Sequence, residues 1–425
     1  MTNDECRKTR EITYKAHSSF VIRHSSFPLT LLILCLTAGC VRREDKDLGV
    51  GFSWPEEPIS AAQKQQEIDA KLARVREFLH QEKLGGALIG REDDFAWISA
   101  GGDNESAALL FLRDDGKNFL IAGEDLSRRL TAEGLKGLRC ESKVVPWYAD
   151  ESPQIRAAVA EASGRRAFGS DISFGGARLI EADFRRIRIP LTPSEVTKYR
   201  WLGKRCGEAV GEVARRLRPF MIERGVEAMV SEALTRRTIR AADIRVAFDA
   251  RASRFPNATP SDAAQLEHFA RIGIRARRWG MDVALTRCVN YGALPGELRS
   301  DLEAAAKVSA GFWARTLPEA PGGTVLQGAI EDYAAAGFPD AWKVHDQGGA
   351  IGYGGWDWLA LPGSRERVLS GQTLAWHPEV GGVRMEDTIL LTGENLEVLT
   401  EIEGWPVVEA RALGRIYRLP GILVR

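Results

Sequence analysis

Apolar residues recur at helical spacing where regular patterning first appears in the chain. Ile68, Leu72, Val75 and Leu79 follow one another at intervals of four, three and four, which places them on one face of a helix. The pattern ends before Gly85, and glycine commonly terminates helices. We therefore predict a helix over residues 61–83 with one buried face.

Short apolar runs of a different kind follow this helix. They are typical of strands and cover residues 87–90, 95–98, 107–112 and 118–122. Asp114-Asp115-Gly116, between the last two runs, predicts a hairpin turn. Helical patterns follow near residues 125–133 and 153–162. These segments indicate one α/β unit that ends near residue 186.

A helix-start signal opens the second half of the chain. Thr192 is a favourable N-cap, Pro193 suits the first helical position, and Glu195 completes a capping box. Apolar residues then mark one helix face as far as Leu217. The patterns after it are a helix over residues 226–241, strands ending near residue 287, helices over residues 298–317 and 324–336, and a final group of strands. This order is α+β.

The final group of strands contains the residues best suited to chemistry. Between residues 343 and 391, β-like runs end at His345, His377 and Glu386. Glycines at 348, 349 and 352 leave space around His345, so we expect a strand to deliver this side chain into a cavity. A structural role for His345 and His377 stays open. Without a metal, Arg275 or Arg287 is the expected partner for the charge of Glu386.

Aromatic residues are frequent in the same region. They are Trp342, Tyr353, Trp356, Trp358 and Trp376. Two interpretations stay open: these side chains pack in the core, or they line a pocket for an apolar or proline-like group.

Composition excludes some classes of function. The chain has 425 residues, of which 44% are hydrophobic and 27% charged, as is usual for a globular protein. Its 58 basic and 58 acidic residues give no net charge, so nothing favours a nucleic-acid partner. The six cysteines show neither zinc-type spacing nor a disulfide framework.

The first forty residues have a separate character. The apolar run from Pro28 to Cys40 is too short to cross a bilayer as a helix, and it resembles the signal of a bacterial lipoprotein. The resemblance implies export, lipidation of Cys40, and anchoring at a membrane on the periplasmic or cell-surface side. An ordinary cleaved signal is the alternative. We expect a signal over residues 1–39 and a tether over residues 40–58.

Five short motifs, in this order, resemble the pita-bread superfamily of methionine aminopeptidases, aminopeptidase P, prolidase and creatinase. They are Asp94-Phe-Ala-Trp-Ile-Ser99, Leu191-Thr-Pro-Ser-Glu195, Thr286-Arg287, His345-Asp-Gln-Gly-Gly349 and Glu386-Asp-Thr388. The resemblance implies an α+β protein of two domains. These are a small α/β creatinase-like domain over residues 59–186 and a C-terminal pita-bread domain over residues 187–425.

The resemblance also implies a site that differs from that of the active peptidases. Those enzymes hold two metal ions with two aspartates, a histidine and two glutamates, and a metal-bound water attacks the peptide. Gly273 and Ala284 stand at the aspartate positions, and His377 stands at one glutamate position. His345 and Glu386 match the remaining histidine and glutamate.

Two further positions bear on catalysis in this family. Phe255 replaces the catalytic histidine of an irregular loop, and Tyr353 lies near the position of another. Phenylalanine cannot transfer protons, which also weighs against the metal-free creatinase mechanism. The candidate catalytic residues are therefore His345 and Tyr353.

Three functions follow as hypotheses. The first is a non-classical hydrolase, such as an Xaa-Pro-type peptidase with one metal, zinc by preference, held by His345, His377, Glu386 and Asp282. The second is an inactive binder of a peptide or small amide, with no metal. The third is a scaffold or interaction subunit. Monomer and homodimer both stay open.

Overall fold

The computed structural model describes residues 57–148 and 151–425. The predicted signal, the lipidation of Cys40 and almost all of the tether therefore lie outside the described residues. Within the described ranges, no helix is both long and apolar enough to cross a membrane.

The first described region is a six-stranded sheet with helices around it. Helix α1 (Ala61–Gln81) begins with a capping box at Ser60 and Gln63. The strands follow the spatial order β4-β3-β2-β1-β5-β6. Their bounds are β1 (Gly86–Ile89), β2 (Leu109–Arg113), β3 (Asn118–Ala122), β4 (Glu141–Val144), β5 (Gly169–Ser170) and β6 (Arg178–Leu179). The helices here are α2 (Glu92–Ile98), α3 (Glu124–Arg129), a π-helix (Leu130–Gly134), α4 (Glu151–Ser163) and α5 (Glu181–Ile187).

One predicted strand of this region is wrong. Residues 95–98 lie in helix α2, where Phe95, Trp97 and Ile98 are all fully buried. A short helix that is buried on every side has apolar residues at consecutive positions, and so does a buried strand, so the sequence pattern does not distinguish them. The informative signal was the acidic first turn of Glu92, Asp93 and Asp94, which favours a helix N-terminus.

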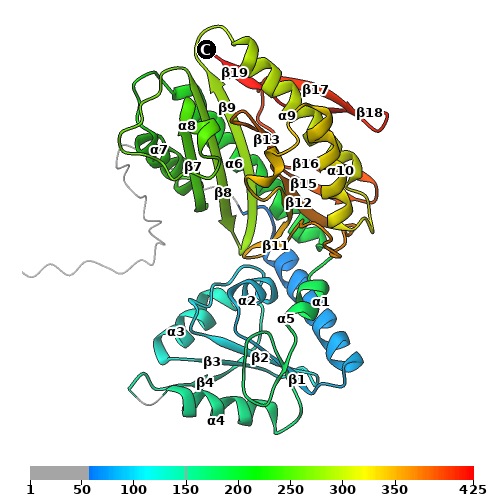
Figure 1. The fold of residues 1–425 in the computed structure, drawn as a ribbon. Helices are drawn as coiled ribbons and strands as arrows, with labels where there is room; N and C mark the ends of the chain where they lie inside the picture. The colour runs from blue at the N-terminus through cyan, green and yellow to red at the C-terminus, as the bar shows by residue number, and fades with distance from the viewer. Residues whose placement is uncertain (1–56, 149–150) are drawn as a thin grey trace, which may run out of the picture. The chain divides into compact units, whose positions relative to one another are not determined.

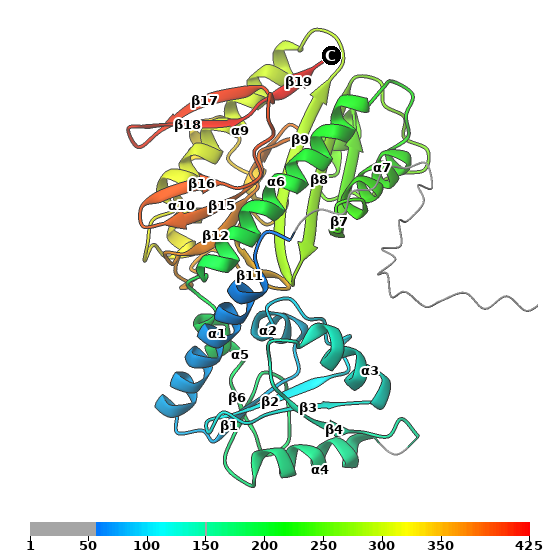
Figure 2. The same cartoon turned by 180° about the vertical axis from the view of Figure 1, so that it is seen from behind.

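Two long helices and a four-stranded sheet open the second region. Helix α6 (Pro193–Arg216) has the predicted capping box and packs along β8 (Phe269–Arg278) and β9 (Met281–Asn290), as Figure 2 shows. Helix α7 (Glu223–Thr235) is shorter than predicted, because β7 (Arg240–Phe248) already begins at Arg240. The sheet order is β19-β9-β8-β7, with β19 at Ile422–Val424. Helix α8 (Ala250–Arg254) follows β7.

A five-stranded sheet lies beside β9 and under two helices. Its order is β11-β10-β12-β15-β16. Helices α9 (Gly296–Arg315) and α10 (Gly322–Ala335) cover it in Figure 1, and Phe312 of α9 stacks on Trp376 at 4.8 Å. The strands are β10 (Gly348–Gly352), β11 (Gly355–Leu359), β12 (Gln372–Trp376), β15 (Asp387–Thr392) and β16 (Asn395–Val398). Two short pairs complete the region, β13 (Glu379–Val380) with β14 (Val383–Arg384) and β17 (Val407–Ala412) with β18 (Arg415–Pro420).

Five buried polar side chains connect α1, α6 and the end of β10. The ammonium of Lys71 contacts Glu67 at 2.6 Å and Glu195 at 2.9 Å, and it donates to the Tyr353 hydroxyl. Tyr353 donates to Glu195, and Lys198 contacts Glu67 at 2.9 Å. Burial, and next the charge of Lys71, lower the pKa of Lys198 to about 8.

This lowered pKa predicts how stability depends on pH. Between pH 8 and 10.5 the unfolded chain keeps a proton on Lys198 that the folded chain has lost, so this residue makes the free energy of unfolding rise with pH. The rise amounts to about 3 kcal/mol. Lys198→Met should abolish it while Glu67 keeps Lys71 as its partner. Urea unfolding of both proteins across this range measures the difference, and a constant difference would contradict the pKa shift.

Candidate functional site

A small cavity lies where β8 and β9 face the ends of β12 and β15. Its volume is about 140 Å³, and its walls include Gly273, Ala284, His377 and Glu386. Strand register places Gly273 opposite Thr286, and an isolated bridge joins Thr286 to Glu386. The structure therefore brings together four of the five positions that the resemblance aligned with metal ligands.

The carboxylate of Glu386 is held by a hydroxyl group. Thr286 Oγ1 donates to Glu386 Oε2 at 2.5 Å, and the glutamate is only 8% exposed. A Cβ atom at position 273 would lie 2.9 Å from the same hydroxyl. Because Gly273 has no side chain, the Thr286 hydroxyl has the space that it needs to contact the Glu386 carboxylate. The expected arginine partners are engaged elsewhere, since Arg287 pairs with Asp387 and Arg275 with Asp282.

His377 lies between two carboxylates. Its Nε2 is 2.9 Å from Asp346 Oδ1, whereas its Nδ1 is 3.6 Å from Glu386 Oε1 and has no hydrogen-bond partner. The hydrogen bond from His377 lowers the pKa of Asp346 to about 2. His377 Nε2 therefore donates its proton to Asp346, whereas Nδ1 faces the carboxylate of Glu386 without a hydrogen bond.

His345 stands behind His377 and belongs to a bend, contrary to the expected strand. The bend follows a single 3-10 turn at Ala341–Lys343, and the strand β10 begins only at Gly348. The two imidazole rings stack at 5.6 Å. His345 Nδ1 donates to the Asp346 carbonyl, and its Nε2 is 3.9 Å from Glu379. Burial, reinforced by the charges of Arg384 and His377, lowers the pKa of His345 to about 4, so this ring is neutral at pH 7.

Glu379 was not identified from the sequence. Burial favours its neutral form, but the charges of Arg271 and Arg384 outweigh burial and lower its pKa. The carboxylate is 2.6 Å from Arg271 and 2.8 Å from Arg384. The sequence signal was available, because Glu379 follows His377-Pro378 directly and Arg384 is five positions further on, but Arg271 is distant in the chain.

The other predicted site residues lie apart from this cavity. Asp282 is fully buried and ion-paired with Arg275 and Arg277. The Tyr353 hydroxyl belongs to the buried group of charges on α1 and α6. Phe255 is 41% exposed and lines a different pocket. Of the aromatic residues, Trp356 lines the cavity, while Trp358 and Trp376 belong to the core.

Metal-binding capacity can be judged from the donor groups. In the part of the chain that the structure describes, no three histidine, cysteine or carboxylate side chains are grouped so that they could hold a metal ion. Gly273 and Ala284 offer no side-chain donor. Three arginines, Arg245, Arg275 and Arg384, line the cavity together with the carboxylates Asp243, Asp346 and Glu386.

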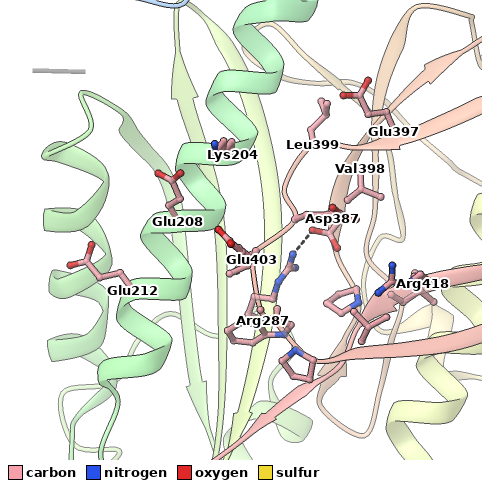
Figure 3. A pocket seen from close by; sticks show the side chains of 18 of the residues that line it. Lys204, Glu208, Glu212, Arg287, Asp387, Glu397, Val398, Leu399, Glu403 and Arg418 are labelled. Carbon is pink, nitrogen blue, oxygen red and sulfur yellow. Dashed lines mark hydrogen bonds and ion pairs between the residues drawn. The ribbon is translucent and has the colours of Figure 1, made fainter. Parts of the chain in front are cut away.

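A larger cavity lies on the other side of Arg287. It has a volume of about 950 Å³, with walls from α6 and from the segment around β16 and β17. Figure 3 shows the ion pair of Arg287 with Asp387 inside it, with Glu208 and Glu212 on the neighbouring helix. Arg287 also donates to the Glu386 carbonyl, so one side chain supports the walls of both cavities.

Comparison with known proteins places the fold. No protein-family model matches the chain. The chain is similar to the dipeptidase PepE from Mycobacterium ulcerans, with a TM-score of 0.68 and 18% identity over 79% of this chain and 96% of that one. It is also similar to the Xaa-Pro dipeptidase from Bacillus anthracis, with a TM-score of 0.66 and 15% identity over 84% of this chain and 100% of that one. The chain therefore has the two-domain pita-bread fold of prolidases and aminopeptidase P.

Sequence similarity points to a further protein. Over 116 residues the chain is 30% identical to the agropine synthesis cyclase of Rhizobium rhizogenes. The match spans 26% of this chain and only 29% of the length of that relative.

The role of Thr286 can be tested through stability. Thr286→Val removes the hydroxyl that donates to the buried Glu386 carboxylate and should lower the free energy of unfolding by about 1–3 kcal/mol. Thr286→Ser keeps the hydroxyl and should stay close to wild type. Urea denaturation with unchanged m-values measures both. Equal losses in the two variants would show that the methyl group, and not the hydrogen bond, is what matters.

Proposed function

We propose that this chain binds a short peptide or small amide in the cavity around His377 and Glu386, without the dinuclear metal centre of the peptidases. The observation that supports this most directly is the position of Thr286. Its hydroxyl donates a hydrogen bond to the Glu386 carboxylate and fills the space beside Gly273, so this carboxylate has a partner without a metal ion.

Charge around the cavity also supports this proposal. Two divalent cations require several anionic ligands nearby. Here Glu386 faces Gly273 and Ala284, and the other two carboxylates in the walls are paired, Asp243 with Arg245 and Asp346 with His377. Asp282, the extra carboxylate of the one-metal hypothesis, is already neutralised by two arginines. The residues present do not fit a dinuclear centre.

The comparisons bear on the ligand. The dipeptidase and the Xaa-Pro dipeptidase with this fold are named for acting on dipeptides. The relative with local sequence similarity is named a cyclase. A peptide or amide ligand is consistent with the names of the two dipeptidases, and a reaction other than metal-dependent peptide cleavage is consistent with the name of the cyclase.

The proposal predicts an absence of metal-dependent turnover. Full-length protein supplied with manganese, cobalt or zinc should not cleave glycyl-proline or a proline-containing tripeptide above the rate of the metal alone. The same protein should bind less than one equivalent of metal after dialysis, as elemental analysis would show. Isothermal titration should nevertheless detect binding of the tripeptide.

Restoring the ligands provides the matched control. A variant with Gly273→Asp, Ala284→Asp and His377→Glu should bind metal more tightly than wild type. Thr286→Ala is added because a Cβ at position 273 would meet the Thr286 hydroxyl. Robust manganese-dependent cleavage by the wild type, surviving His377→Ala, would contradict the proposal. No gain of metal by the restored variant would contradict the alignment.

A metal-free hydrolase is the second candidate function. His377 Nδ1 faces the carboxylate of Glu386 at 3.6 Å without a hydrogen bond, and Asp346 holds the opposite nitrogen at 2.9 Å. In its neutral form, an imidazole held in this way can take a proton from water as the oxygen adds to an amide carbonyl, and can return it to the departing amine.

This candidate predicts cleavage that a chelator does not suppress. Hydrolysis of the tripeptide in EDTA should fall by about 10²-fold or more in His377→Gln, the usual scale for losing a general base. It should persist in His345→Gln, because His345 does not line the cavity. Equal activity of His377→Gln and wild type would exclude this mechanism.

A further inference from the structure

A second pocket lies next to the cavity, formed by the loop after α8. It has a volume of about 460 Å³ and is lined by residues 251 and 254–259, together with Val344. Asn257 lines this pocket and also the cavity of His377. The two spaces therefore adjoin at Asn257.

The loop is held firmly at its base. Glu223 is fully buried and accepts hydrogen bonds from the backbone N–H groups of Phe248 and Ser261, at 2.8 and 2.7 Å. It also forms an ion pair with Arg251 at 3.1 Å. One carboxylate thus joins both ends of the segment between β7 and residue 261.

The inner side of the loop is bonded to arginines of the candidate site. Arg271 and Arg384 donate to the Pro256 carbonyl, and Arg245 donates to the Asn257 carbonyl. Two of these arginines, Arg245 and Arg384, line the small cavity. The loop is therefore pre-organised by the same side chains that shape the inner site, which lowers the entropic cost of binding a ligand there.

The outer side of the loop presents an apolar ring and a cation. Phe255 is 41% exposed, and the guanidinium groups of Arg251 and Arg254 lie 5.5 and 5.1 Å from its ring centre. Val344, 64% exposed, lines the same pocket. Arg251 forms an ion pair with Glu223, but Arg254 has no hydrogen bond or ion pair within the described ranges of the chain. Exposed apolar side chains on a rigid loop, beside an unpaired cation, suit a ligand that is both apolar and anionic.

We infer that this pocket is an outer subsite, in which Phe255 and Arg254 bind the apolar, carboxylate-bearing end of a peptide-like ligand whose other end occupies the cavity of His377. The inference rests on the proposed function, and it specifies the ligand class. Phe255 stands where related enzymes have a catalytic histidine, and in this chain the position serves recognition.

The experiment compares two forms of one probe. Glycyl-prolyl-phenylalanine with a free carboxylate and the same tripeptide with a C-terminal amide are titrated into full-length protein by calorimetry. Wild type should bind the acid roughly three- to five-fold more tightly than the amide, the scale of an exposed ion pair. Arg254→Gln should remove this preference and leave amide binding unchanged. Phe255→Ala should weaken both forms.

Arg365→Gln is the matched control, because Arg365 is also exposed and lines neither pocket. It should retain the preference for the acid. If wild type binds both forms and Arg254→Gln keeps the preference, the subsite is refuted while the proposed function stands. If wild type binds neither form, and binding is equally absent from the Arg254→Gln and Arg365→Gln variants, both proposals fail.

Discussion

The buried charges of α1 and α6 constrain the rest of the structure. Glu67, Lys71, Glu195 and Lys198 are each no more than 2% exposed. Such groups are stable only as a set, because removal of one leaves another charged and unpaired in a medium of low polarity. The position of α1 against α6 is therefore specified by charge pairing as well as by apolar packing.

Glu195 shows how this constraint extends to the site. One oxygen accepts from the Thr192 N–H and completes the capping box of α6, while the other accepts from Tyr353. Burial alone would raise the pKa of this carboxyl, but Lys71 and these hydrogen bonds outweigh it and lower the pKa. Tyr353 directly follows β10, which pairs with β12, and His377 directly follows β12. The start of α6 and the histidine of the cavity thus belong to one connected framework.

The cavity itself depends on a second set of charges. Arg271 and Arg384 neutralise Glu379. The same two arginines donate hydrogen bonds to the Pro256 carbonyl and so hold the loop after α8. Arginine suits this role because its planar group donates several hydrogen bonds in fixed directions. In the cavity itself, three arginines, Arg245, Arg275 and Arg384, lie beside three carboxylates, Asp243, Asp346 and Glu386.

The sequence by itself determined the features that depend on neighbours in the chain. The capping boxes of α1 and α6, and the absence of donor atoms at Gly273 and Ala284, follow from residue identity and short spacing. The tertiary structure alone decided which partners the polar residues take. Thr286 and Glu386 are 100 positions apart, and Arg271 holds a carbonyl and a carboxylate from two other segments. A helix cap forms within four residues, whereas the partner of a buried charge depends on which strands the whole fold brings together.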